Sequence, residues 1–175
     1  MSPVRAKATP VDIVVLQPAW RQALKDAAPL ARAAARAALK GAGHGFERRG
    51  IAVALADDDL LRDLNRRYRG RDKPTNVLSF DTGAPDRLGD IALALATLKA
   101  EARAQNKTLK AHFQHLVVHG TLHLLGFDHE EPGPAGAMEA LEREILTGLG
   151  VRDPYRLLPP NESRKRAAKR TRPKH

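Results

Sequence analysis

The sequence predicts an α+β fold, close to the α/β class, in which a small mixed four-stranded sheet is covered by about five helices. Short β-branched segments alternate with helical segments in the first half of the chain, and a pair of short apolar segments joined by a turn follows them. The rest of the chain shows helical patterns only. With 175 residues, the chain is long enough for one domain with a sizeable core and too short for two full-sized domains.

The first half supplies two predicted strands and two predicted helices. Residues 11–16 are short and β-branched, as in a strand, whereas residues 19–40 carry apolar side chains at helical spacing. We expect Pro29 to split or kink this helix. The apolar segment 51–56 predicts a second strand. Residues 60–68 predict a helix that follows three aspartates able to cap its N-terminus.

The remaining elements are two strands and three helices. Residues 77–80 and 90–95 are short apolar segments separated by a turn with Gly and Pro, which favours a hairpin. Helical spacing of apolar side chains predicts helices over residues 96–105, 109–125 and 135–149. Two strands that alternate with helices, followed by a hairpin and more helices, are typical of a single mixed four-stranded sheet with helical cover.

The charge is unevenly distributed along the chain. Thirty Lys and Arg oppose twenty Asp and Glu, a formal net charge of +10, which favours a polyanionic partner such as nucleic acid. Residues 161–175 hold seven basic side chains and one acidic one. We therefore predict an N-terminal arm over residues 1–10, one domain over residues 11–158 and a basic tail over residues 159–175. The tail is expected to be disordered because it lacks apolar side chains to pack.

Several classes of protein are disfavoured by composition. The chain has no cysteine, which excludes disulfides, thiol catalysis and cysteine zinc sites, so a transition metal would need His, Asp or Glu ligands. Its longest apolar segments have six residues, whereas a membrane-spanning helix needs about 20. The first ten residues contain no apolar signal segment, so we expect a cytoplasmic protein without membrane contact.

The segment HGTLHLLGFDH contains three histidines with metal-ligand spacing. His119 and His123 lie one helical turn apart on one face. Gly126 can adopt the left-handed conformation that ends a helix, which lets the chain bring His129 back to the same point. The three would form a tripod with an open fourth position, as in metzincin zinc sites. The alternative is that they are isolated histidines that are exposed or cap the helix. Asp128 could orient a ligand histidine or form a local turn.

Neighbouring residues refine this hypothesis. His115 lies about 12 Å along the helix axis from His123, so one metal cannot bind both, and we expect it beside the ligands or in the core. His112 is expected at the surface. Zincin peptidases place a glutamate directly after the first histidine, where this chain has Gly120, so peptidase activity is disfavoured. We expect the acidic side chains that follow the motif to be solvated, namely Glu130, Glu131, Glu139 and Glu142.

Three motifs together resemble the YbeY family of bacterial endoribonucleases. They are HGTLHLLGFDH, LNRRYRGRDKPTNVLSF at residues 64–80 and LGDI at residues 88–91, within a resemblance that covers residues 11–155. The resemblance implies a single domain with helices on a small mixed sheet and one Zn²⁺ per chain held by His119, His123 and His129. It also places the family's functional arginine at Arg69. Asn76, where many members have Asp, and Asp81, where Pro is usual, depart from the family pattern, and the basic tail lies outside it.

The resemblance implies a zinc-dependent endoribonuclease that cleaves single-stranded ribosomal RNA. Its implied role is ribosomal RNA maturation, notably at the 3′ end of the small-subunit RNA, and ribosome quality control. The implied partners are therefore single-stranded ribosomal RNA and the ribosome, or its small subunit with its assembly factors. The metal would activate water or polarise a phosphate oxygen, and these two roles stay open.

Two alternatives to an RNA-cleaving enzyme remain. One is a non-catalytic, RNA-binding ribosome assembly factor with a structural zinc, and the other is a metal-dependent hydrolase of another substrate. The open tripod argues against a structural zinc, which usually has four protein ligands. The guanidinium of Arg69 could hold two phosphate oxygens, or it could be one solvated charge among its neighbouring arginines.

Overall fold

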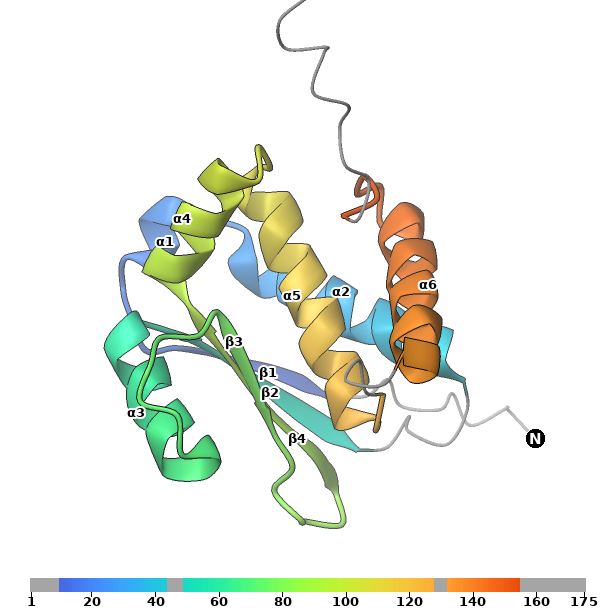
Figure 1. Cartoon of the computed structure of the whole chain (residues 1–175), viewed down its shortest axis with the longest axis horizontal. Coiled ribbons are helices and arrows are strands. Elements are labelled where there is room, and N and C mark those ends of the chain that lie inside the picture. The colour runs from blue at the N-terminus through green and yellow to red at the C-terminus, as the bar shows by residue number, and fades with distance from the viewer. Residues whose placement is uncertain (1–9, 44–48, 128–131, 155–175) are drawn as a thin grey trace, which may run out of the picture.

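Four short strands form one mixed sheet with helices on both faces (Figure 1). The computed structural model describes residues 10–43, 49–127 and 132–154. The strands are β1 (Val11–Val15), β2 (Gly50–Ala56), β3 (Val77–Phe80) and β4 (Arg87–Ala94). Their order is β1-β2-β4-β3, with β2 parallel to both β1 and β4 and with β3 antiparallel to β4 at the edge. The predicted fold class and the predicted hairpin of β3 and β4 are confirmed.

The described residues also form six helices. These are α1 (Trp20–Ala23), α2 (Ala27–Ala42), α3 (Asp58–Arg69), α4 (Leu95–Ala104), α5 (Leu109–Leu124) and α6 (Pro132–Gly148). Helices α2 and α5 pack against each other over one face of the sheet, α6 contacts both of them, and α3 covers the other face (Figure 1). Within the described ranges, no helix is both long enough and apolar enough to cross a membrane.

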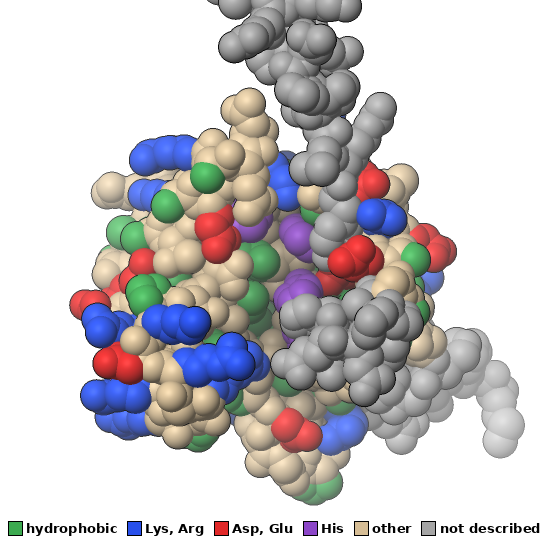
Figure 2. All heavy atoms as spheres, in the orientation of Figure 1, with side chains coloured by type: hydrophobic (Ala, Val, Ile, Leu, Met, Phe, Trp, Pro, Cys, Tyr) green, Lys and Arg blue, Asp and Glu red, His purple; other side chains and the backbone are tan. Residues whose placement is uncertain are grey.

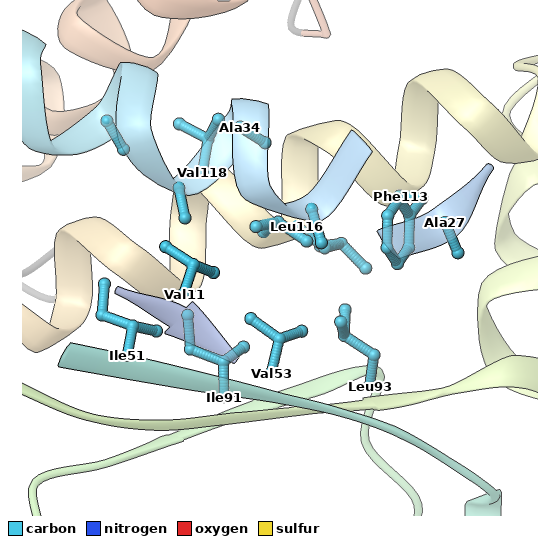
Figure 3. Close-up of a cluster of buried hydrophobic side chains, with 14 of the residues drawn as sticks. Val11, Ala27, Ala34, Ile51, Val53, Ile91, Leu93, Phe113, Leu116 and Val118 are labelled. Carbon is cyan, nitrogen blue, oxygen red and sulfur yellow. The ribbon is translucent and has the colours of Figure 1, made fainter. Parts of the chain in front are cut away.

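The alternation of side chains along the strands creates the two-sided sheet. Ile51, Val53 and Leu93 point from the sheet toward Phe113 of α5 and Ala34 of α2, where they form the larger core (Figure 3). The opposite face carries a smaller cluster that packs against α3. Small side chains at helical spacing allow α2 to approach its neighbours closely. The fully buried ones are Ala31, Ala34, Ala35 and Ala38.

The segment predicted as one helix over residues 19–40 is two helices, α1 and α2, and the chain leaves helical geometry at residues 24–26. Pro29 is the third residue of α2, where its missing N–H removes no helical hydrogen bond. A helix continuing back from Pro29 would place its ring against the carbonyl of Lys25. Pro29 therefore favours the break in the helix at residues 24–26, on the N-terminal side of the proline. The predicted aspartate cap of α3 is present, because Asp57 Oδ1 accepts a hydrogen bond from Leu60 N at 2.8 Å.

Gly89 of β4 is required by close backbone packing. Its φ of +151° belongs to a region that favours glycine, and an added Cβ would overlap the carbonyl oxygen of Phe80. We expect Gly89→Ala to lower the free energy of unfolding by about 3 kcal/mol or more, through backbone strain and overpacking. Gly136→Ala is the control, since an added Cβ there has no neighbour within 4 Å. Denaturant unfolding that gives equal stability for both variants would contradict this assignment.

Candidate metal centre

Helix α5 carries a row of four histidines on one face. They are spaced three or four residues apart, and successive ring centroids are 6.4, 6.2 and 4.5 Å apart along the row His112, His115, His119 and His123. Thr108 caps the N-terminus of the helix by accepting a hydrogen bond from Ala111 N at 3.0 Å. Histidine side chains line a hollow on the face of the molecule shown in Figure 2. The closest two rings of the row, those of His119 and His123, therefore bring nitrogen donors to one site.

The spacing of His119 and His123 brings their Nε2 atoms to 2.9 Å from each other. The two nitrogens are within hydrogen-bond distance of each other. Two nitrogen ligands of a tetrahedral zinc ion lie about 3.3 Å apart, so the two rings would need to separate by about 0.4 Å to bind one metal ion together. The helix ends just beyond His123, and Gly126 has the predicted left-handed conformation, with φ of +92°. His129 and Asp128 lie outside the described residues. The third ligand therefore stays a prediction.

Glu142 of α6 is the residue that the sequence analysis missed. It was expected to be solvated, but its side chain is 0% exposed. Its Oε1 lies 2.5 Å from His119 Nδ1 and its Oε2 lies 3.2 Å from His115 Nε2. The physical reason is that Glu142 shares the helix face that Met138 and Ile145 bury in the core. The sequence did contain a signal for this burial, namely a carboxylate within the apolar face of the helix. A buried charge requires a partner, so such a position indicates a contact with another element.

His115, His119 and Glu142 also form a second group that could hold a metal, with one donor atom of each within 4.8 Å of the others. The 2.5 Å separation between His119 and Glu142 is a hydrogen-bond length. It is shorter than the roughly 3.3 Å between two ligands of one tetrahedral zinc. This second group is therefore better described as two histidines hydrogen-bonded to one carboxylate. His115 lies beside the candidate ligands, as the helix geometry predicts.

His112 was expected at the surface, but it is only 3% exposed. Its Nε2 lies 2.7 Å from Glu101 Oε2, and Glu101 also accepts a hydrogen bond from Asn76 Nδ2 at 3.1 Å. The prediction was wrong because α4, which carries Glu101, packs against this part of α5. Burial lowers the pKa of the His112 imidazole below its usual value of 6.5, and the hydrogen bond to Glu101 opposes this effect only in part.

The lowered pKa of His112 predicts a loss of stability in acid. In the unfolded chain His112 takes up a proton as the pH falls through 6.5, whereas the buried imidazole resists protonation until a lower pH. The unfolded state then binds more protons, so the free energy of unfolding falls below that pH. His112→Gln keeps a donor for Glu101 but cannot titrate, and its stability should fall less between about pH 7 and pH 5. Denaturant unfolding at both pH values that shows equal losses would contradict this.

Gly120 fits tightly against the sheet. Ser79 Oγ donates a hydrogen bond to the Gly120 carbonyl at 2.9 Å, and an added Cβ would lie 3.0 Å from Ile91 Cγ2. A Cβ at this position would face the sheet, and its neighbours Ile91 and Ser79 would have to move by a few tenths of an ångström. The close packing favours glycine here, and without the zincin glutamate a peptidase mechanism is disfavoured.

Arg69 is the last residue of α3, and its side chain is exposed. Gly70 ends the helix in the left-handed conformation, with φ of +64°. Three other arginines of α3 form ion pairs with Asp63 or Asp72, whereas Arg69 forms none with the described part of the chain. Figure 2 shows Lys and Arg side chains gathered over α3, on the same face as the histidines of α5. This face combines positive charge with the candidate metal ligands.

The edge strand β3 lies between these two parts of the face. Its Ser79 side chain reaches the α5 backbone beside His119, and the next side chain, Phe80, belongs to the cluster that packs against α3. Tyr68 of α3 contacts Phe80, with ring centroids 5.1 Å apart. The C-terminal end of α3 and the C-terminal half of α5 are therefore joined through opposite faces of one short strand.

Comparisons with known proteins match most of the chain. A family model described as Endoribonuclease YbeY matches residues 19–150. The Endoribonuclease YbeY of Azorhizobium caulinodans is 50% identical over 154 residues, which cover 84% of this chain and 96% of that relative. The protein of the same name from Paramagnetospirillum magneticum is 47% identical over 148 residues, with 79% and 90% covered.

A solved structure shares the fold. The solution structure of TM1509 from Thermotoga maritima superimposes with a TM-score of 0.53 and covers 87% of this chain and 99% of that chain. The two sequences are 23% identical, so this similarity concerns the fold alone.

Proposed function

Since the chain belongs to the YbeY endoribonuclease family, we propose that it is a zinc-dependent endoribonuclease that cleaves single-stranded ribosomal RNA. The observation that carries the metal dependence is the 2.9 Å approach of the Nε2 atoms of His119 and His123. Two imidazoles that converge in this way are a donor set typical of zinc. His129 is proposed as the third ligand, which leaves a fourth position for water or a phosphate oxygen.

When bound, zinc would lower the pKa of a coordinated water or polarise a phosphate oxygen of the substrate. The protein's own contribution is to hold the ligands and bring the RNA backbone to them. The hollow that exposes the histidines lies on the same face as the arginines of α3 (Figure 2). Phosphate groups are attracted to such a basic surface whatever the base sequence.

Arg69 is proposed to bind the phosphate that is cleaved. Its guanidinium can donate two parallel hydrogen bonds to phosphate oxygens, which stabilises the negative charge that develops as water attacks phosphorus. The lack of an ion pair to Arg69 among the described residues supports this role, because an arginine already paired with a carboxylate would have to give up that contact. The ion-paired arginines of α3 are better suited to general attraction of the RNA.

The proposed biological role is maturation of ribosomal RNA, notably at the 3′ end of the small-subunit RNA, together with ribosome quality control in the cytoplasm. The proposed partners are the ribosome, or its small subunit with its assembly factors. This role rests on the family to which the chain belongs, and the basic surface supports a polyanionic partner.

The direct test is cleavage of a labelled single-stranded RNA by zinc-loaded and by chelated protein, with a duplex of the same sequence as the control. We expect cleavage of the single strand only, loss of cleavage on chelation and recovery when zinc is restored. Protein that binds the RNA with zinc present but never cuts it would instead favour a non-catalytic assembly factor.

A further inference from the structure

We infer that Glu142 is a positioning residue that fixes the His119 ring for metal binding. This inference rests on the metal site of the proposed function. Glu142 is 0% exposed, and both of its oxygens are engaged, one with His119 and one with His115. Because both ends of the carboxylate are held by side chains of α5, its plane and its distance from His119 are restrained.

The bond to Glu142 selects the tautomer of His119. When the Glu142 carboxylate is ionised it only accepts hydrogen bonds, and the His119 Nδ1 that lies 2.5 Å from Oε1 then carries the proton. A neutral imidazole protonated on Nδ1 has its lone pair on Nε2. That Nε2 is the atom that faces His123 Nε2 at 2.9 Å. The tautomer selected by Glu142 is therefore the one in which His119 offers a lone pair at the candidate metal position.

Glu142 is better placed for this indirect role than as a ligand. The two nitrogens of an imidazole point away from opposite sides of the ring, so Glu142 and His123 approach His119 from opposite sides. Carboxylates that accept a hydrogen bond from the second nitrogen of a ligand histidine are common at zinc sites, and their loss weakens metal binding about 10–100-fold.

Packing alone does not account for a carboxylate at this position. Glu142 lies on the face of α6 that buries Met138, Ile145 and Leu146, where an apolar side chain would avoid the cost of removing a charge from water. Its partners on α5 satisfy the carboxylate, and one of them is a candidate ligand. The contact also couples the placement of α6 to the orientation of the metal site.

A second buried His–Glu pair on the same helix supplies a matched control. Glu101 bonds to His112 at 2.7 Å, and His112 lies about two turns from His119. Zinc affinity should be measured by chelator competition for the wild type, Glu142→Gln and Glu101→Gln. We expect Glu142→Gln to bind zinc about 10–100-fold more weakly, and Glu101→Gln to bind it as the wild type does. Equal affinity for Glu142→Gln and the wild type, or equal weakening in both variants, would overturn the inference.

Two further measurements separate a positioning residue from a ligand and from a structural residue. Nitrogen NMR shifts of His119 in metal-free wild-type protein should show a proton on Nδ1, and a proton on Nε2 would overturn the inference even if the Glu142 variant does not fold. The cobalt-loaded Glu142→Gln protein should keep the wild-type visible spectrum, because no ligand is lost. An altered spectrum would identify Glu142 as a ligand instead. Failure of the wild type to bind zinc would contradict the proposed function, whereas the NMR result would still decide whether Glu142 fixes the tautomer of His119.

Discussion

Replacement of His123 by Ala is expected to remove zinc from the purified protein and to abolish metal-dependent RNA cleavage. His123 supplies one of the two Nε2 atoms that converge at 2.9 Å, so the variant leaves at most two of the three proposed histidine ligands. Loss of a carboxylate behind a ligand already weakens binding by up to about 100-fold, and loss of the ligand itself should weaken it further. Metal analysis of wild type and variant, purified side by side, measures the effect directly, with about one zinc per chain expected in the wild type.

His112→Gln is the matched control for this experiment. It changes a histidine of the same helix whose described hydrogen bond is to Glu101 rather than to the candidate ligands. We expect it to keep a full zinc content and the cleavage rate of the wild type. Undiminished zinc in His123→Ala would refute the ligand assignment, provided that both variants have the circular dichroism spectrum of the folded protein.

Arg69→Ala is expected to slow the cleavage step by about 10²–10³-fold, which is the usual effect of removing one donor that stabilises the transition state. RNA affinity should change far less, because the remaining basic side chains of α3 still attract the backbone. Arg69→Lys should recover only part of the rate, since an ammonium group cannot donate two parallel hydrogen bonds in a fixed plane. Single-turnover cleavage with enzyme in excess separates this step from RNA binding.

Arg67→Ala is the matched control for Arg69. Arg67 lies on the same exposed helix end, with its side chain 67% exposed, but it is ion-paired with Asp63 at 3.1 Å. We expect its removal to weaken RNA binding slightly and to leave the single-turnover rate unchanged. Zinc content should be normal in both variants. A wild-type cleavage rate in Arg69→Ala, or an equal loss in Arg67→Ala, would refute the specific role of Arg69.

The burial of Glu142 and of His112 shows where local reasoning failed. Both side chains were expected in contact with water, and both are buried because a second helix packs over them. Glu142 lies 23 residues from His119 in the chain, so no spacing rule links the two. A charged residue within an apolar stripe indicates that some partner exists. Only the packing of α6 on α5 decides which one.

The sequence by itself determined the features that depend on neighbours along the chain. Strand alternation and helical periodicity predicted the four strands and the helices, apart from the break that separates α1 from α2. The turn between β3 and β4 indicated their hairpin, and the four-residue spacing of His119 and His123 placed both on one face of α5. These features follow from the repeat of the backbone itself, which is the same in any helix or strand.

The tertiary structure alone decided the strand order, the position of α3 across the sheet from α5 and the partner of each buried polar side chain. Such features depend on which faces pack together, and many arrangements of the same elements would satisfy the same local pattern. A buried carboxylate or imidazole is stable only where a partner from another element reaches it. The orientation of His119 by Glu142 is therefore a property of the assembled fold and not of the histidine motif.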